Sequence, residues 1–170
     1  PSTQAARTLA DRIGGRPIEK VVARVHPHAL VTAGKPDPQT PLEGKFSVPF
    51  CISLGLRGYR AVYTDFTDAT MQDPAVKDLV PRVELQPVEG QAPHSAFLDV
   101  QMEDGEVLHA KTDIVLGHPD NPMGWEDLLD KFQGLSEPVL GAGKTQALYE
   151  CIRAFEEPGS LEKLATLVRA

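Results

Sequence analysis

The chain has 170 residues, a formal net charge of −7 and an isoelectric point near 5.2. This length allows one domain with a substantial apolar core. The negative charge argues against nucleic acid or a membrane as a partner, and no apolar run approaches the roughly 18 residues that span a bilayer. The two cysteines, Cys51 and Cys151, do not make a disulfide framework, so we expect a cytoplasmic protein.

The N-terminal part predicts a helix followed by a strand. Residues 2–13 carry a helical period and are followed by Gly14 and Gly15, which end the segment. The apolar face of this helix is formed by Ala6, Leu9, Ala10 and Ile13. Residues 18–25 alternate imperfectly and are rich in β-branched side chains, which is typical of a strand.

The most apolar long stretch of the chain runs from residue 40 to residue 57. Apolar side chains spaced four apart form two rows along it. One row is Phe46, Phe50 and Leu54, and the other is Val48, Ile52 and Leu56. A helix with apolar rows on two sides is expected to be buried rather than to lie on a surface. We place this buried helix at about residues 48–57, ended by Gly55 and Gly58.

Two helix-start patterns occur within this stretch. Thr40 matches an N-cap, with proline next to it and Glu43 at the third helical position. Ser47 matches a second N-cap, with Pro49 in the first turn, where the missing N–H of proline costs little. We therefore expect a helical turn at residues 41–45, a break, and then the buried helix.

Short elements are expected after the buried helix. Residues 61–66 predict a short extended segment. Asp73 and Pro74 match an N-cap and first helical residue, so we expect a short helix to about Val80, ended by Pro81.

Three strand patterns then follow closely, at residues 82–88, 95–103 and 106–113. Asp104-Gly105 lies between the last two and is a strong signal for a type I′ hairpin turn. The predicted antiparallel pair is therefore fixed by local sequence.

Helical periodicity dominates the rest of the chain. After a loop at residues 114–124, we expect helices at residues 125–132, 142–156 and 160–168. The order of elements predicts an α+β fold with two layers, in which helices cover one face of a mostly antiparallel sheet and the C-terminal segment is helical. We expect a single domain over residues 1–170.

The start of the buried helix is a candidate anion site. Free backbone N–H groups at a helix N-terminus, the Lys45 ammonium and the Ser47 hydroxyl together suit a carboxylate or phosphate. In the structural alternative, Ser47 only caps the helix and Lys45 points into water or pairs with Glu43 or a surface aspartate. Residue chemistry by itself favours this alternative.

Other chemistry-bearing residues fit structural roles better than catalytic ones. Residues 141–145, GAGKT, look like the end of a phosphate loop, but Pro138 stands where the motif requires glycine and no apolar strand precedes it. We interpret the glycine as a hinge at a helix start. No metal-ligand spacing connects the histidines, which are His26, His28, His94, His109 and His118.

The remaining candidates are a cysteine and a group of acids. Cys51 falls in the buried helix without a cationic neighbour in register, so we expect a core thiol rather than a nucleophile. Asp65, Asp68 and Asp73 lack a calcium-loop pattern and are expected to be solvated or to cap helices.

Several segments resemble, in order, the motifs of one known family. Residues 41–50, PLEGKFSVPF, resemble its run E-A-K-F-S-x-P-Y, and residues 18–25 resemble its strand I-x-x-V-x-V-x-V. Further matching segments are Asp65-Phe-Thr67, Asp73-Pro-Ala-Val76, Asp104-Gly105, and Asp120-Asn-Pro122 through Lys131-Phe132. The chain is thus similar over nearly its whole length to the MmgE/PrpD family, which includes 2-methylcitrate dehydratase of propionate catabolism, cis-aconitate decarboxylase and iminodisuccinate epimerase.

This resemblance implies that the chain is the second, smaller domain of a longer enzyme. The family's helical N-terminal domain and its K-x-Y-P-x-C…H segment, which hold the catalytic histidines and lysines, are expected before residue 1. The smaller domain is then a lid over the active-site cleft, with no cofactor and no metal. The implied partners are a small carboxylate substrate, the helical domain, and a second copy in a homodimer when full length.

The resemblance also implies site residues. It places Lys45, Ser47 and Phe50 at the cleft as substrate-binding residues, and we expect no catalytic residue in this chain. Gly44 replaces the usual alanine. Phe50 replaces the usual tyrosine and so removes a hydroxyl, which leaves the substrate open among small di- and tricarboxylates such as 2-methylcitrate.

Two functions from different classes follow. The first is the second domain of a metal-independent lyase, a dehydratase or an isomerase, whose isolated fragment is inactive. The alternative is a non-catalytic oligomerisation or interaction module of a divergent family member. An upstream sequence that keeps the K-x-Y-P-x-C segment and its histidines favours the enzyme.

Overall fold

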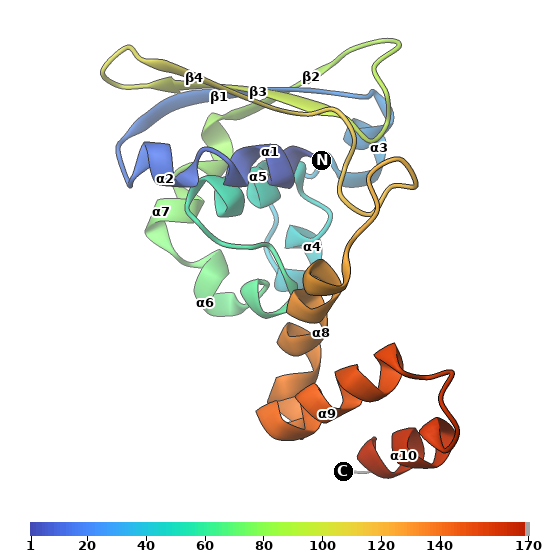
Figure 1. Cartoon of the computed structure of the whole chain (residues 1–170). Helices are drawn as coiled ribbons and strands as arrows, with labels where there is room; N and C mark the ends of the chain where they lie inside the picture. The colour runs from blue at the N-terminus through green and yellow to red at the C-terminus, as the bar shows by residue number, and fades with distance from the viewer. Residues whose placement is uncertain (169–170) are drawn as a thin grey trace. The chain divides into compact units, whose positions relative to one another are not determined.

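The computed structural model describes residues 1–168, shown in Figure 1. The chain forms two compact units, residues 1–121 and residues 122 onward. The single domain expected over residues 1–170 stays a prediction.

The first unit is built on a four-stranded mixed sheet with the strand order β2-β1-β3-β4. Its strands are β1 (Ile18–Val25), β2 (Val83–Pro87), β3 (Ala96–Met102) and β4 (Val107–Thr112). The β1–β2 pair is parallel, whereas the β1–β3 and β3–β4 pairs are antiparallel. The α+β prediction and its mostly antiparallel sheet are therefore confirmed.

Helices cover one face of this sheet in the first unit (Figure 1). Two of them precede β1, namely α1 (Ser2–Arg7) and α2 (Ala10–Ile13). Those between β1 and β2 are α3 (His28–Ala33), α4 (Pro41–Gly44), α5 (Val48–Leu56), η1 (Tyr63–Asp65), α6 (Asp68–Met71), α7 (Pro74–Lys77) and η2 (Val80–Arg82). The long connection between parallel strands is thus filled by short helices, as a parallel pair requires a crossover rather than a tight turn.

Alternation along the strands separates a buried face from a solvated one. Val21 and Ala23 on β1 and Leu98 and Val100 on β3 are at most 1 % exposed, and they face the helices. The opposite face carries ion pairs, including Arg24 with Asp99 at 2.6 Å and Lys20 with Glu84 at 2.6 Å. This pattern is the expected one for a sheet with one wet face.

Helix α5 occupies the centre of the helical layer. Ile52 and Leu56 pack with the sheet and α1, while Phe50 and Leu54 pack into a second apolar cluster with α6, α7 and η2. The prediction that α5 is buried on two sides is confirmed. Gly55 lies within α5 and does not end it. Its lack of a side chain serves packing, because a Cβ there would lie 2.8 Å from the Cβ of Ala6 on α1.

Over its described residues, 122–168, the second unit has three helices, α8 (Trp125–Leu140), α9 (Ala142–Arg153) and α10 (Ser160–Leu167). Leu148, Tyr149 and Cys151 of α9 are buried, and the Tyr149 hydroxyl donates to the Trp125 carbonyl oxygen at 2.8 Å. Gly141 lies between α8 and α9 with a φ of +76° and is the N-cap of α9, so the glycine stands at a helix start as predicted, and its action as a hinge stays a prediction.

Some predicted boundaries at the N-terminal and C-terminal ends were wrong. The helix expected over residues 2–13 breaks at Thr8, whose hydroxyl donates to the Ala5 carbonyl oxygen at 2.8 Å and competes with the backbone ladder. Helix α8 continues to Leu140, eight residues beyond the predicted end at Phe132. Pro138 lies within the last turn of α8, where it has no N–H to donate to the carbonyl oxygen of Gly134, and the helix ends two residues later.

Other corrections concern loops and turns. Residues 61–66 contain the 3-10 helix η1 instead of an extended segment, because the Asp65 carboxylate accepts the Val62 backbone N–H at 3.1 Å. The hairpin at Asp104-Gly105 is confirmed, but its turn is not type I′. Gly105 has a φ of +88°, whereas Asp104 does not have a positive φ, so the loop has three residues with glycine in the left-handed position.

None of the described helices is long and apolar enough to cross a bilayer.

Phe50 and Phe46 provide a matched pair for testing the core. Phe50 is 2 % exposed, whereas Phe46 is 56 % exposed and lies outside the helix, contrary to the predicted apolar row. We expect Phe50→Ala to cost about 3–5 kcal/mol of unfolding free energy because it leaves a cavity. Phe46→Ala is expected to cost under about 1 kcal/mol. Urea unfolding of both variants checks this, and equal losses would contradict the packing described.

Candidate functional site

The candidate site is the junction between α4 and α5, and both of its predicted caps are confirmed. The Thr40 hydroxyl accepts the Glu43 backbone N–H at 3.2 Å, with Pro41 as the first residue of α4. The Ser47 hydroxyl accepts the Phe50 backbone N–H at 3.2 Å. The chain therefore starts a helix twice within a few residues, because each start has its own side-chain acceptor.

Ser47 makes a second hydrogen bond that the sequence did not predict. Its hydroxyl donates to the Lys35 carbonyl oxygen at 2.6 Å, and the side chain has no exposed surface. Gly34 and Ser47 also form an isolated β-bridge. Ser47 thus ties the loop after α3 to the start of α5, and both functions of its hydroxyl are used within the chain.

Glu43 fixes the same loop from the other side. Its carboxylate lies 2.7 Å from the Lys35 ammonium and also accepts the Gln39 backbone N–H at 2.7 Å. The hydrogen bond from Lys35, followed by that from Gln39, holds the pKa of Glu43 below its ordinary value. Lys35, and not Lys45, is the cation that pairs with Glu43.

Lys45 is held by aromatic rings instead of a carboxylate. Its ammonium lies 5.0 Å from the ring centroid of Tyr63 and 5.7 Å from that of Phe66. Among the described residues no acidic side chain forms an ion pair with it, and the side chain is exposed. A cation placed in this way keeps its N–H groups available for an anionic ligand.

Phe66 connects Lys45 to Phe50. The rings of Phe50 and Phe66 have centroids 6.2 Å apart, a distance typical of an aromatic pair. Gly44 makes this arrangement possible, because a Cβ there would lie 3.0 Å from the Phe50 ring and 3.3 Å from the Met71 sulfur. The alanine of the family motif would therefore press on the ring in this chain.

Tyr63 and Phe66 are site residues that sequence reasoning missed. The segment that carries them was expected to be extended, and nothing in its spacing linked it to Lys45. The available signal was the family-like Asp65-Phe-Thr67 segment, which contains Phe66 and begins two positions after Tyr63.

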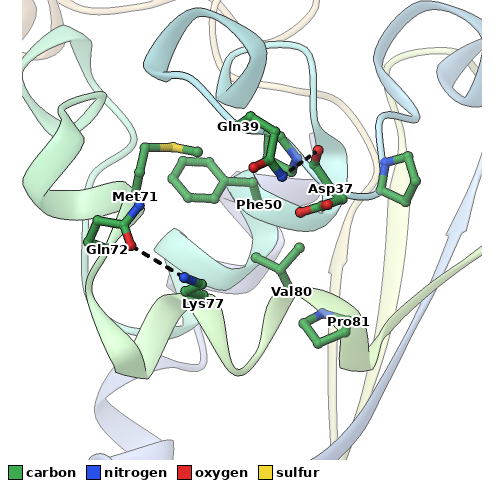
Figure 2. Close-up of a pocket in the computed structure, with 10 residues that line it drawn as sticks. Asp37, Gln39, Phe50, Met71, Gln72, Lys77, Val80 and Pro81 are labelled. Atoms are coloured by element: carbon green, nitrogen blue, oxygen red, sulfur yellow. Dashed lines mark hydrogen bonds between the residues drawn. The ribbon is translucent and has the colours of Figure 1, made fainter.

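A cavity of about 260 Å³ borders Phe50 (Figure 2). It is lined by the loop at residues 36–39, by Phe50, and by residues of α6, α7 and η2. Of the three predicted substrate-binding residues only Phe50 lines it, while Lys45 and Ser47 do not. Lys45 is therefore not part of the cavity lining, and it is related to Phe50 only through Phe66, which contacts both.

The other aspartates and histidines considered in the sequence analysis make contacts that fit structural roles. Asp65 and Asp73 accept backbone N–H groups at helix starts, as expected for caps. The rings of His94 and His118 stack with centroids 4.3 Å apart. No group of three or more His, Cys, Asp or Glu side chains is placed to hold a metal ion in residues 1–168.

Comparison with known proteins assigns the chain to a family. The model of the MmgE/PrpD C-terminal domain matches residues 1–157. Cis-aconitate decarboxylase of Homo sapiens is 23 % identical over 156 residues, which cover 89 % of this chain and 32 % of that protein. Cis-aconitate decarboxylase of Mus musculus is 26 % identical over 156 residues, which cover 89 % of this chain and 31 % of that protein.

The chain belongs to the MmgE/PrpD family and corresponds to its C-terminal domain. It spans about a third of the length of the curated relatives that it matches.

Cys51 allows a test of burial at the site. Burial of this half-buried thiol raises its pKa to about 11, so about 0.1 % is thiolate at pH 8. In a Cys151→Ala background we expect iodoacetamide to react with Cys51 at least about 100-fold more slowly than with a free cysteine. The rate should keep rising as the pH approaches 11. The free energy of unfolding should fall over the same pH range, because the pKa of Cys51 is higher in the folded than in the unfolded chain and loss of the proton therefore favours unfolding.

The control for this measurement is the same variant in concentrated urea, where the reaction should reach the rate of a free thiol. A rate in the folded protein that levels off near pH 8.5 would contradict the burial of Cys51.

Proposed function

We propose that this chain is the lid domain of a metal-independent lyase, dehydratase or isomerase that acts on small di- or tricarboxylates. Membership of the MmgE/PrpD family supports this class, and the name of the relatives, cis-aconitate decarboxylase, points to a tricarboxylate. The helical domain, the homodimer and the cytoplasmic location expected from the resemblance belong to the same proposal.

The observation that carries the proposal is the environment of Lys45. A di- or tricarboxylate needs a fixed positive charge with free N–H groups. Lys45 has no acidic partner among the described residues and lies against Tyr63 and Phe66. The charge is therefore positioned by rings that do not neutralise it.

The three predicted site residues then have different roles in the proposal. Lys45 contacts a substrate carboxylate directly. Ser47 holds the start of α5 and the loop after α3 through its two hydrogen bonds. Phe50 supports Phe66, the ring that lies between it and Lys45.

The acid–base chemistry is proposed to come from outside this chain. A dehydratase or decarboxylase requires a proton donor or base within hydrogen-bond reach of the substrate. The rings that contact the Lys45 ammonium belong to Tyr63 and Phe66, and neither residue is a histidine or a carboxylate. The isolated chain therefore binds and covers substrate without converting it.

The second candidate is a non-catalytic interaction module. The exposed apolar side chains of Leu42, Phe46 and Tyr63 favour it, because exposed apolar surface suits a protein partner. The two candidates differ in the effect of Lys45 on turnover by the longer protein.

The test is Lys45→Met in the full-length protein with cis-aconitate and 2-methylcitrate as substrates. Loss of a charge-assisted contact in a closed cleft should cost about 2–4 kcal/mol of transition-state binding, or about 30- to 1000-fold in kcat/KM. Lys111→Met is the matched control, since Lys111 pairs with Asp113 at 2.7 Å on β4 and should leave kcat/KM unchanged. Unchanged kinetics of Lys45→Met, with activity present in the parent, would refute the role of Lys45.

A further inference from the structure

The cavity beside Phe50 has no role in the proposed function. At about 30 Å³ for each water molecule, its volume of about 260 Å³ corresponds to about nine waters. This is the size of a ligand with about nine non-hydrogen atoms, below the usual range for larger cofactors.

The floor of the cavity is apolar. Phe50, Met71 and Val80 are each at most 9 % exposed, and Pro38 is also buried. These side chains offer an apolar surface to any molecule that enters, and displacing water from it favours binding.

The rim carries one negative and one positive charge. The Asp37 carboxylate has no hydrogen bond or ion pair with any residue from 1 to 168, and the Lys77 ammonium bonds the neutral amide oxygen of Gln72 at 3.3 Å. Figure 2 shows Asp37 and Lys77 on either side of Val80. A di- or tricarboxylate would bring two or three negative charges to a rim that offers one cation and one carboxylate, so the rim suits this substrate class less well than a ligand with one charge of each sign.

The loop that carries Asp37 is held in place without using its side chain. The Lys35 carbonyl oxygen accepts a hydrogen bond from the Ser47 hydroxyl, and the Lys35 ammonium donates to the Glu43 carboxylate. The Gln39 backbone N–H also donates to Glu43. The prolines at positions 36 and 38 restrict the loop further. A wall fixed in this way loses little conformational freedom when a ligand binds.

We propose that this cavity binds a small zwitterion with an apolar body, of the class of the aliphatic amino acids. Asp37 accepts hydrogen bonds from the ligand ammonium, and Lys77 donates to the ligand carboxylate. The aliphatic side chain lies against Phe50, Met71 and Val80. L-leucine, with nine non-hydrogen atoms, matches the volume.

The experiment titrates the isotopically labelled chain with four probes and follows its amide signals by NMR. L-leucine carries both charges, isopentylamine only the ammonium, 4-methylpentanoate only the carboxylate, and glycine lacks the apolar body. We expect L-leucine to shift the signals of residues 36–39 and 71–81 in a saturable way at millimolar concentration. The two singly charged probes should bind up to about fivefold more weakly, because each lacks one exposed ion pair, and glycine should bind more weakly because it has no apolar body to bury.

Two variants assign the charges. Asp37→Asn should weaken L-leucine and isopentylamine about fivefold and leave 4-methylpentanoate unchanged, and Lys77→Met should weaken L-leucine and 4-methylpentanoate only. Asp113→Asn is the control, because Asp113 lies at the end of β4 and pairs with Lys111. These are exposed positions, so the variants keep the fold.

Three results would overturn the proposal. The first is no saturable shift with L-leucine up to about 20 mM, a concentration well above a millimolar dissociation constant. The second is equal affinity for L-leucine and either singly charged probe, and the third is an unchanged affinity for L-leucine in both variants.

Discussion

The hydroxyl of Ser47 is the group on which this site depends. It accepts the Phe50 backbone N–H, which starts α5, and donates to the Lys35 carbonyl oxygen, which fixes the loop after α3. A buried hydroxyl with both hydrogen bonds made is stabilising, whereas removing it would leave a buried N–H and a carbonyl oxygen unsatisfied. One side chain therefore sets the direction of the central helix and the wall of the neighbouring cavity at once.

Lys45 and the cavity beside Phe50 differ in their electrostatics. Lys45 lies over the rings of Tyr63 and Phe66 and is exposed. Asp37 and Lys77 give the rim of the cavity no net charge. Because ring quadrupoles hold a cation without neutralising its charge, Lys45 can still attract an anion, whereas the cavity rim as a whole attracts neither sign.

Much of the fold could be predicted because its signals are local. The caps at Thr40 and Ser47, the strand period and the hairpin at Gly105 each depend on residues close in sequence. The contacts of Tyr63 and Phe66 with Lys45 could not be predicted from the sequence. They are made by tertiary packing, and the residues between position 57 and position 66 show no helical or strand period. The exposure of Phe46 was missed for a related reason, since the break between α4 and α5 removes it from the helical row.

The parallel pairing of β1 with β2 has a consequence for the order of folding. Val21 pairs with Val83, so this contact closes a loop of 62 positions (83 − 21), whereas β3 and β4 join through a three-residue loop. Loop-closure entropy makes the distant pairing slow, so β3–β4 is expected to form early and β2 to dock late. Until β2 docks, one edge of β1 is unpaired, and an open strand edge is a place where nascent chains associate with one another.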